Sequence, residues 1–482
     1  MNLKRTSFLT LDDLARITGG YWINKKNEML FCEVTHVYEY LKENDLFVIY
    51  DASWYDRDRT NIHQIARAIK KDITGIIIKE GTQKDISIPA LVVEDTFFAL
   101  KEIALANAEL SSSKRLIVTG SFGKTAFKGQ LYHVLKKQFV TYARLSSANR
   151  VVPMYCNLAS LKKEDEILII EQPIAKKNKP SVRAKFVKPN ILVITSIGHE
   201  HIEGYGTIKN IVKKKISMAK ALKKGSKIII PKEDAFYSLI QDELKKYKDI
   251  EVCTFGSTKE CNAYIIKSEY KNFNWYITAS IENVEVSYIL PFPEVYAPLA
   301  SLSVLLSAYY LGADIVESSK EYCNASNFPT SGKFYKIKYN EKTFYLYDQS
   351  KRGGIEGYLA FFRTLNYINP EYNGKKIVLT SEFVDYKDGE MKYINISEFR
   401  KVIKNANIDI LYTVENFQMH ESVLESSNLT HKYIENLDAF QEELLNSIEE
   451  NDLLCVKGIY ESNLPDFIDY LKSVDEFFLE EL

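Results

Sequence analysis

The sequence predicts an α/β protein of three domains. Its 482 residues are too many for one hydrophobic core, because single cores stop growing at about 250–300 residues. A composition of 46% hydrophobic and 26% charged residues is that of a globular chain. Short, uniformly apolar runs recur between helical patterns, which is typical of parallel sheets that helices cover on both faces.

The first predicted domain covers residues 1–110. Three apolar runs in it have the length and composition of buried strands, and helical patterns lie between them. A serine run, residues 111–113, follows a helical segment and is too polar to support a core, so we place the first boundary there. The strand candidates are LFVIY (46–50), GIIIK (75–79) and ALVV (90–93).

The second predicted domain covers residues 111–327 and contains the most regular series of apolar strands. Its parallel-sheet pattern is that of a nucleotide-binding α/β domain. Alternating polar and apolar residues over 250–295 predict an antiparallel meander, and a buried helix follows over 297–311. The strand candidates of the parallel part are RLIVTG (115–120), EILIIE (166–171), NILVITSI (190–197) and KIIIP (227–231).

The third predicted domain, residues 328–482, repeats the alternation of strand and helix and is expected to be Rossmann-like. The acidic end of the sequence, DEFFLEEL, is interpreted as the solvated end of a helix. The strand candidates are TFYLYD (343–348), KKIVLTSEF (375–383), IDILYTVEN (408–416) and NDLLCVKG (451–458).

Charge and cysteine content exclude several classes of protein. With 63 basic and 64 acidic residues, the chain lacks the footprint of a dedicated nucleic-acid binder. Its six cysteines form no CxxC pair, which argues against a disulfide framework or a structural zinc. No run approaches the ~20 apolar residues that cross a bilayer. We therefore expect a cytoplasmic monomer or dimer with no nucleic-acid or membrane partner.

The strongest local signal is TGSFGKT, residues 119–125, which lies between an apolar strand and a helix. Glycines at 120 and 123 let the backbone amides, with Ser121, turn toward phosphate oxygens at the positive end of the helix dipole. Lys124 can neutralise the terminal phosphates, and the hydroxyl of Thr125 can reach Mg²⁺. Val118 stands where the longer form of this motif has its first glycine, and a chance G-K-T turn is the alternative.

Two further segments lie where parallel sheets collect ligands. Glu171 ends one strand, and GHEHIEGYG (198–206) follows the next. His199, Glu200 and His201 suggest either a metal site or ordinary loop histidines, because H-x-H without a third ligand is a weak zinc signal. The run Lys213–Lys215 is interpreted, from its residues alone, as a solvated helix face.

Together, TGSFGKT with Lys128 and ITSIGHEHIEGYG (194–206) resemble the Mur ligases, in the branch that adds D-alanyl-D-alanine. FLTLDDLARITGGYW, PTSGKF (329–334) and VKG (456–458) extend the resemblance over essentially the whole chain, in the same three-domain order. The resemblance implies that ATP phosphorylates a substrate carboxylate, and that an amine then attacks the acyl phosphate to give an amide, ADP and phosphate.

The resemblance also implies roles for individual residues. Lys124, His201 and Lys215 match catalytic positions, and Lys215 matches a lysine that becomes a carbamate and holds a second Mg²⁺. Thr125, Glu171 and His201 match metal contacts. Gly120, Ser121, Gly123, Lys124 and Thr125 match the ATP loop, Lys333 replaces an arginine that contacts the nucleotide, and Asp348 matches an acidic residue at the cleft.

The departures from the family pattern concern the substrates and the base. Val37, Tyr38 and Glu39 replace the D-S-R that helps to hold a uridine nucleotide, and Thr60, Asn61 and Ile62 replace D-G-H. Ser217 replaces a glutamate, and the segment 296–300 lacks the histidine and asparagines expected near adenine. In the third domain, YDQSKRGG (347–354) replaces D-D-S-Y-N-A-N-P.

We therefore predict an ATP- and Mg²⁺-dependent ligase that joins a carboxylate to an amine on a substrate other than the standard UDP-linked muramyl peptide. The alternative is a degenerate relative that acts as an ATP-responsive binding or scaffold protein. A requirement for both an acid and an amine in ADP formation distinguishes the two.

Overall fold

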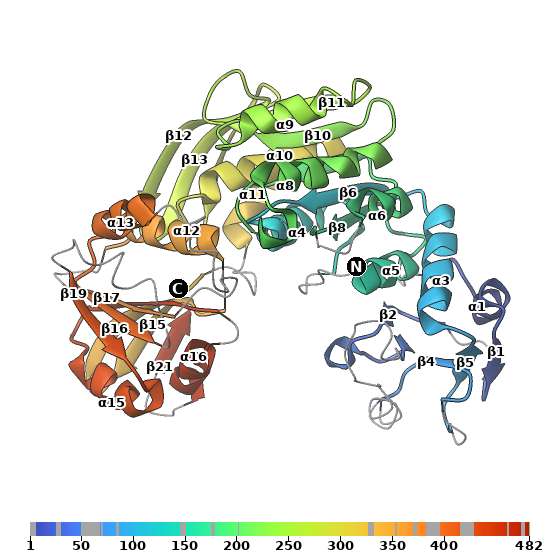
Figure 1. Cartoon of the computed structure of the whole chain (residues 1–482), viewed down its shortest axis with the longest axis horizontal. Helices are drawn as coiled ribbons and strands as arrows, with labels where there is room; N and C mark the ends of the chain where they lie inside the picture. The colour runs from blue at the N-terminus through green and yellow to red at the C-terminus, as the bar shows by residue number, and fades with distance from the viewer. Residues whose placement is uncertain are drawn as a thin grey trace.

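The computed structural model of the chain contains three β-sheets, each flanked by helices (Figure 1). The sheets fall within the three predicted ranges, and the predicted boundaries after residues 110 and 327 stay predictions. The structure describes residues 6–25, 30–49, 68, 71–82, 86–144, 151–174, 179–200, 202–325, 332–351, 354–369, 374–381, 396–414, 429–459, 462–473 and 478–481.

The first sheet has five strands in the order β1-β5-β4-β3-β2, with β1 antiparallel to its neighbour and the others parallel. The three predicted strands are β3, β4 and β5. Helix α1 begins with a capping box in which Thr10 and Asp13 bond to each other's backbone amides. The elements are α1 (Leu11–Thr18), β1 (Tyr21–Ile23), β2 (Val34–Thr35), η1 (Tyr38–Tyr40), β3 (Leu46–Val48), β4 (Gly75–Lys79), β5 (Ala90–Val93) and α3 (Thr96–Leu110).

The central sheet has nine strands in the order β14-β13-β12-β11-β10-β9-β6-β8-β7. The predicted apolar strands are β6, β8, β9 and β10, which run parallel, and the predicted meander is β12 to β14. The strands are β6 (Lys114–Thr119), β7 (Thr141–Tyr142), β8 (Ile167–Glu171), β9 (Ile191–Ile194), β10 (Lys227–Pro231), β11 (Glu251–Gly256), β12 (Ala263–Lys271), β13 (Asn274–Ile281) and β14 (Val284–Leu290).

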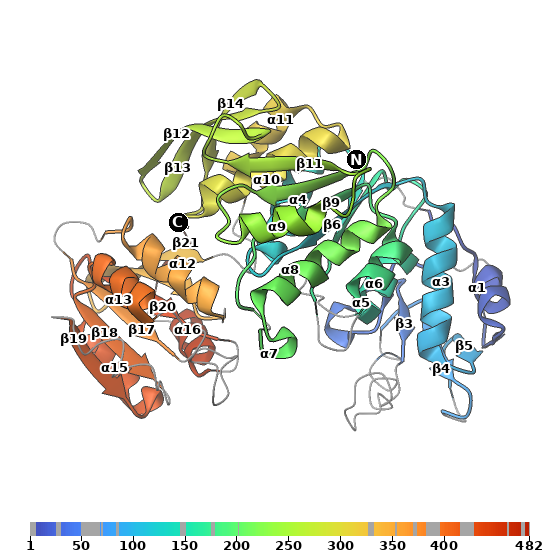
Figure 2. The same cartoon turned by 45° about the horizontal axis from the view of Figure 1, so that its top comes forward.

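Helices cover both faces of the central sheet, as its uniformly apolar strands require (Figure 2). Successive strand residues point to opposite faces, so Ile117 packs with α5, α6 and α8, whereas Leu116 and Val118 pack with α4 and α10. The helices are α4 (Lys124–Leu135), α5 (Val151–Ala159), α6 (Pro180–Val187), α7 (Ile202–Tyr205), α8 (Ile208–Ile216), η3 (Ser217–Ala221), α9 (Tyr237–Leu244), α10 (Ala297–Leu311), α11 (Ile315–Lys320) and η4 (Glu321–Asn324).

The third sheet has seven strands in the order β19-β18-β17-β20-β16-β15-β21, of which the first five are parallel. Helix α12 of this unit lies beside the central sheet (Figure 1). The elements are β15 (Lys333–Tyr339), β16 (Lys342–Gln349), α12 (Ile355–Leu365), β17 (Lys376–Thr380), α13 (Ile396–Asn405), β18 (Ile410–Val414), β19 (Thr430–Ile434), α15 (Leu437–Ser447), β20 (Leu453–Lys457), α16 (Leu464–Ser473) and β21 (Phe478–Glu481).

One interpretation of the third unit is wrong. The acidic end of the sequence contains a strand, β21, that pairs antiparallel with β15, and is not a helix end. The edge of β15 offers backbone hydrogen bonds to the last segment, and pairing with this edge determines its conformation. A local charge pattern does not reveal such a distant partner.

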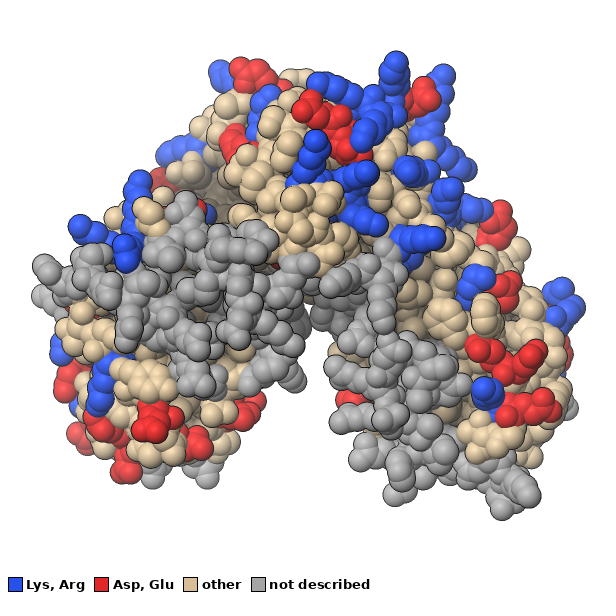
Figure 3. Space-filling model, viewed as in Figure 1, with Lys and Arg blue, Asp and Glu red and all other residues tan. Residues whose placement is uncertain are grey.

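Lysines gather on the outer helices of the central unit, at the top of Figure 3. Residues 204–232 contain nine lysines and no acidic residue, although the whole chain is close to neutral. Lys209, Lys213 and Lys220 are exposed, as expected for a solvated face. Lys215, on the same helix as Lys213, is fully buried, so one lysine of this run has a different environment from the others.

Candidate functional site

The predicted phosphate loop lies between β6 and α4, so the strand, loop and helix that the motif requires are all present. Gly123 has φ 84° at the N-cap of α4, a conformation that favours glycine. An added Cβ at Gly120 would overlap the Oγ1 of Thr195. Both glycines therefore serve the geometry of the loop, one through its backbone angle and the other through a close approach.

The segment after β9 holds the phosphate loop in place. The amide of Ser121 donates to the carbonyl of Ser196 (2.9 Å), and the amide of Phe122 donates to the Ser196 hydroxyl (2.9 Å). The Gly198 amide donates to the Ser121 hydroxyl (2.8 Å). The loop is thus fixed before any ligand binds, and a preorganised anion site loses little entropy on binding.

Lys124 folds back over its own loop. Its Nζ donates to the carbonyls of Gly120 (2.7 Å) and Ser121 (3.1 Å) and lies 3.0 Å from the Glu200 carboxylate. The side chain is almost fully buried. A cation at the positive end of α4 opposes the helix dipole, and an arriving phosphate removes that conflict.

Thr125 and Glu171 form the second part of the site. The Thr125 hydroxyl lies 3.1 and 3.0 Å from the two carboxylate oxygens of Glu171, at the end of β8. The same carboxylate lies 3.1 Å from the Nζ of Lys128, with both side chains buried. Removing one partner of a buried ion pair leaves an uncompensated charge, so this pair fixes the position of the carboxylate.

Lys215 reaches the same site from α8. Its side chain is fully buried, and its Nζ has no hydrogen-bond partner among the described residues. Burial, reinforced by the charge of Lys124, lowers the pKa of Lys215 to about 7, although Glu200 and Glu356 oppose the shift. The amine is therefore largely neutral at slightly alkaline pH. The interpretation of the whole run as a solvated face is wrong for this residue.

The structure thus brings together the loop residues, Glu171 at the end of β8 and Lys215 in the last turn of α8. His201 lies outside the described residues, so its predicted role stays a prediction. Of the two other residues of the suggested metal cluster, Glu200 pairs with Lys124, and His199 Nδ1 lies 3.7 Å from Glu356.

Lys333 and Asp348 lie opposite each other in the register of β15 and β16. The Asp348 carboxylate accepts a hydrogen bond from the Ser350 amide (2.9 Å) and lies 3.4 Å from Lys472. Both predicted nucleotide contacts therefore sit on the third sheet, and Asp348 is engaged within that unit. Their roles toward a nucleotide stay predictions.

Comparisons with known proteins agree with this geometry. The model of the Mur ligase middle domain matches residues 118–291. The UDP-N-acetylmuramoyl-tripeptide–D-alanyl-D-alanine ligase of Rickettsia prowazekii is 23% identical over 436 residues, which cover 89% of this chain and 93% of that protein. Residues 118–291 thus match the middle domain of the Mur ligase family, and the chain as a whole is similar to a D-alanyl-D-alanine-adding Mur ligase. The family comprises ATP-dependent acid–amine ligases, whose substrates are a carboxylate and an amine.

Solved structures show that the Mur ligase fold extends over the whole chain. A crystal structure of MurF from Acinetobacter baumannii has a TM-score of 0.76 at 18% identity, covering 98% of this chain and 100% of that one. The MurF ligase of Thermotoga maritima in complex with ADP has a TM-score of 0.67 at 16% identity, covering 92% and 98%. No described helix of the chain is long and apolar enough to span a membrane.

One residue of this candidate site was missed by the sequence analysis. Glu356, in the first turn of α12, accepts a hydrogen bond from the His199 amide at 2.5 Å. An added Cβ at Gly198 would overlap the Glu356 carboxylate, which gives this glycine a packing role. The two residues are more than 150 positions apart, and only the docking of the third unit brings them together.

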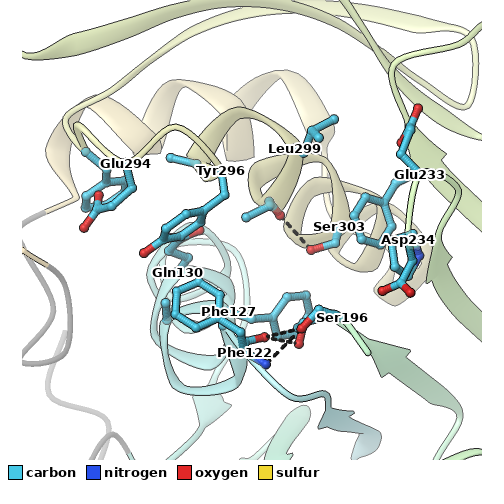
Figure 4. A pocket seen from close by; sticks show the side chains of 18 of the residues that line it. Phe122, Phe127, Gln130, Ser196, Glu233, Asp234, Glu294, Tyr296, Leu299 and Ser303 are labelled. Carbon is cyan, nitrogen blue, oxygen red and sulfur yellow. Dashed lines mark hydrogen bonds between the residues drawn. The ribbon is translucent and has the colours of Figure 1, made fainter. Parts of the chain in front are cut away.

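A pocket opens beside the phosphate loop (Figure 4). It has a volume of about 360 Å³ and lies between α4, α10 and the ends of β10 and β11. The rings of Phe122 and Tyr296 meet edge to face with centroids 4.8 Å apart. Other lining residues are Gly123, Ala126, Phe127, Gln130, Thr195, Ser196, Glu233, Asp234, Phe255, Phe292, Glu294, Leu299, Ser303 and, from α12, Arg363.

Proposed function

We propose that the protein uses ATP to join a substrate carboxylate to an amine through an acyl phosphate. The observation that supports this most directly is the buried, unpartnered amine of Lys215 beside Lys124 and Glu200. Burying a polar group without a hydrogen bond costs on the order of 1–3 kcal/mol. A site that only had to be stable would have an apolar residue there, so we assign the amine to chemistry.

ATP is proposed to bind with its phosphates on the loop 120–125. The loop amides and the start of α4 face the phosphate oxygens, and Lys124 exchanges its backbone carbonyl partners for them. Transfer of a phosphoryl group depends mainly on positioning and on neutralising charge. The preformed hydrogen bonds of Ser121 and Phe122 supply the positioning.

The donor set fits Mg²⁺ in part. A hydroxyl, Thr125, and a carboxylate, Glu171, offer hard oxygen ligands side by side, and Mg²⁺ commonly completes its shell with phosphate oxygens and water. The neutral amine of Lys215 can add CO₂, losing a proton to become a carbamate with two further oxygen ligands. Mg²⁺ held there would neutralise charge on the phosphate oxygens.

In the proposed first step, a carboxylate oxygen attacks the γ-phosphorus, and the bond to the β-phosphate oxygen breaks to release ADP. The amine then attacks the acyl carbon, phosphate leaves with the bonding pair, and the nitrogen loses a proton. Helix α12 lies against the phosphate loop, where an added Cβ at Gly357 would be 3.8 Å from the Phe122 ring. Such docking would protect the acyl phosphate from water.

The acid is proposed to differ from the UDP-linked tripeptide named for the relatives. Val37, Tyr38 and Glu39 supply no arginine or aspartate for a nucleotide diphosphate, and the Tyr38 ring is covered by Lys71 at 4.6 Å. Thr60, Asn61 and Ile62 lie outside the described residues. The loop YDQSKRGG likewise offers a different set of contacts to the amine.

The test is ADP release from Mg-ATP by the full chain, with acids and amines supplied singly and in pairs. An ¹⁸O-labelled carboxylate should transfer its label to the released phosphate when both substrates are present. UDP-N-acetylmuramoyl-tripeptide with D-alanyl-D-alanine is the reference pair. We expect ADP release to be faster with a peptide acid that lacks the UDP group than with this pair. ADP release that needs neither acid nor amine would contradict the ligase proposal.

A scaffold protein is the second candidate, because the base pocket lacks the side chains expected near adenine. It predicts that Mg-ATP binds without any pair of substrates producing ADP. Calorimetric titration of Mg-ATP, followed by the label transfer, separates the two functions.

A further inference from the structure

The pocket beside the phosphate loop is lined by polar side chains that are already engaged in hydrogen bonds. The Asp234 carboxylate accepts from the amides of Ile197 (2.7 Å) and Phe236 (2.8 Å). The Ser303 hydroxyl donates to the carbonyl of Ala300 in its own helix (2.6 Å). Both side chains therefore already carry hydrogen bonds within the protein.

The charged side chains of the lining are also committed. Glu294 accepts from the Gly332 amide (3.0 Å), and Glu233 accepts from the amide and hydroxyl of Ser257 (2.5 and 2.8 Å). Arg363 forms an ion pair with Glu398 at 2.5 Å. The lining residues Ala297, Leu299 and Ala300 of α10 carry no hydrogen-bonding side chain, so that wall of the pocket is apolar.

Gln130 is the exception. It lies on α4, less than two turns beyond the phosphate loop, and only 7% of its surface is exposed. Figure 4 shows it on the α4 side of the pocket, whose lining it shares with Tyr296. Its side-chain amide has no hydrogen-bond partner among the described residues. Its nitrogen and oxygen are nevertheless not among the described polar atoms that are both fully buried and unpartnered, so they keep some exposed surface. A side-chain amide that is more than nine-tenths buried and unpartnered is therefore open to the pocket.

We propose that Gln130 is the residue that recognises the adenine base. This inference rests on the proposed ATP site. The carbonyl oxygen of a glutamine accepts from the exocyclic N6 amino group of adenine while its NH₂ donates to the adjacent ring nitrogen, as in protein contacts with adenine in DNA. Phe122 and Tyr296 supply aromatic surface for the faces of the base. The shape of the pocket and the two hydrogen bonds of the Gln130 amide would then select adenine over other bases.

The test is calorimetric titration of the full chain with three probes in Mg²⁺ buffer. The probes are ADP, purine riboside diphosphate, which lacks only the N6 amino group, and inorganic tripolyphosphate. Wild type should bind purine riboside diphosphate about 5- to 30-fold more weakly than ADP. Gln130→Met, which keeps the size and burial of the side chain, should weaken ADP by a similar factor and bring the two nucleotides within threefold of each other.

Tripolyphosphate should bind both proteins equally, since it does not reach the pocket. Gln138→Met is the matched control, because Gln138 bonds to Ser318 and Asp314 away from the pocket, and its affinity for every probe should be that of wild type. The inference is overturned if wild type binds both nucleotides equally, or if Gln130→Met keeps wild-type discrimination. The wild-type comparison needs no variant, so it stands even if Gln130→Met does not fold. Failure of all probes to bind wild type would instead contradict the proposed ATP site itself.

Discussion

The phosphate loop and the pocket beside it are proposed to bind two parts of one ligand through different kinds of contact. In the loop, charged and backbone groups hold one another in place: Lys124 has three oxygen partners, and Glu171 has both Thr125 and Lys128. The pocket is mainly aromatic and apolar, with its polar side chains except Gln130 turned to internal hydrogen bonds. Most of the binding energy is therefore expected from the phosphates and most of the selectivity from the pocket.

The two regions also differ in how they are built. The loop is one continuous segment, whereas the pocket collects residues from α4, α10, the ends of two strands and α12. The loop is held by hydrogen bonds to one neighbouring segment, residues 196–198, whereas a pocket assembled from several distant segments changes whenever one of them moves. Variants in the loop should therefore lower both the affinity for the phosphates and turnover, whereas variants in the pocket should lower the affinity for the base with little change in turnover.

The largest effect is expected at Lys124. Lys124→Ala removes the charge nearest to the phosphates and the ion pair with Glu200, so ADP release should fall by about 100- to 1000-fold. Lys137→Ala, just beyond the far end of α4 where the side chain is exposed, is the control and should keep the wild-type rate. Equal rates for wild type and Lys124→Ala would remove the phosphate-loop assignment.

Lys215→Ala should reduce turnover by about 100-fold while Mg-ATP binds within threefold of wild type, because the residue is assigned to chemistry and not to affinity. A short carboxylic acid added to the assay should restore part of the rate by replacing the carbamate oxygens. Lys213→Ala, two positions away on the exposed face, should behave as wild type. Full activity of Lys215→Ala would contradict the carbamate proposal.

A pocket variant should show the reverse behaviour. Tyr296→Ala removes one aromatic wall, so the Kd for Mg-ATP should rise about tenfold while the maximal rate of ADP release changes less than threefold. Tyr309→Ala, on the exposed side of α10, serves as the control. A large fall in the maximal rate without a change in Kd would show that the pocket takes part in the chemistry.

The smallest effect is expected in stability against pH. The pKa of Lys215 is about 7 in the folded protein and 10.5 ordinarily, so between these values the unfolded chain binds more protons. The free energy of unfolding should therefore rise with pH from about 7 to about 10, by at most about 1.4 kcal/mol per unit. Lys215→Met should lose this slope. Urea unfolding in CO₂-free buffer at pH 7, 8 and 9 measures it, and identical slopes would show that the amine is not buried as described.

The sequence analysis predicted best where function lies in one segment. The strand, the glycines and the helix around Lys124 are adjacent in the chain, so their arrangement follows from local rules. Family resemblance singled out Lys215, while its residue context indicated a solvated face, because burial depends on which side of α8 meets the sheet. The place of Glu356 in the site and the pairing of β21 with β15 both depend on contacts between distant segments, and no local pattern indicated either of them.

The ring of Phe122 touches two parts of the molecule at once. It meets Tyr296 at the mouth of the base pocket, and it lies under the first turn of α12 near Gly357. A nucleotide in the pocket would lie against this ring, and the start of α12 lies beside the same ring when the third unit is docked. Entry of ATP and departure of ADP should therefore occur only while α12 is lifted. The steady-state rate then has a ceiling set by how often the third unit separates, however fast the bond-forming steps become.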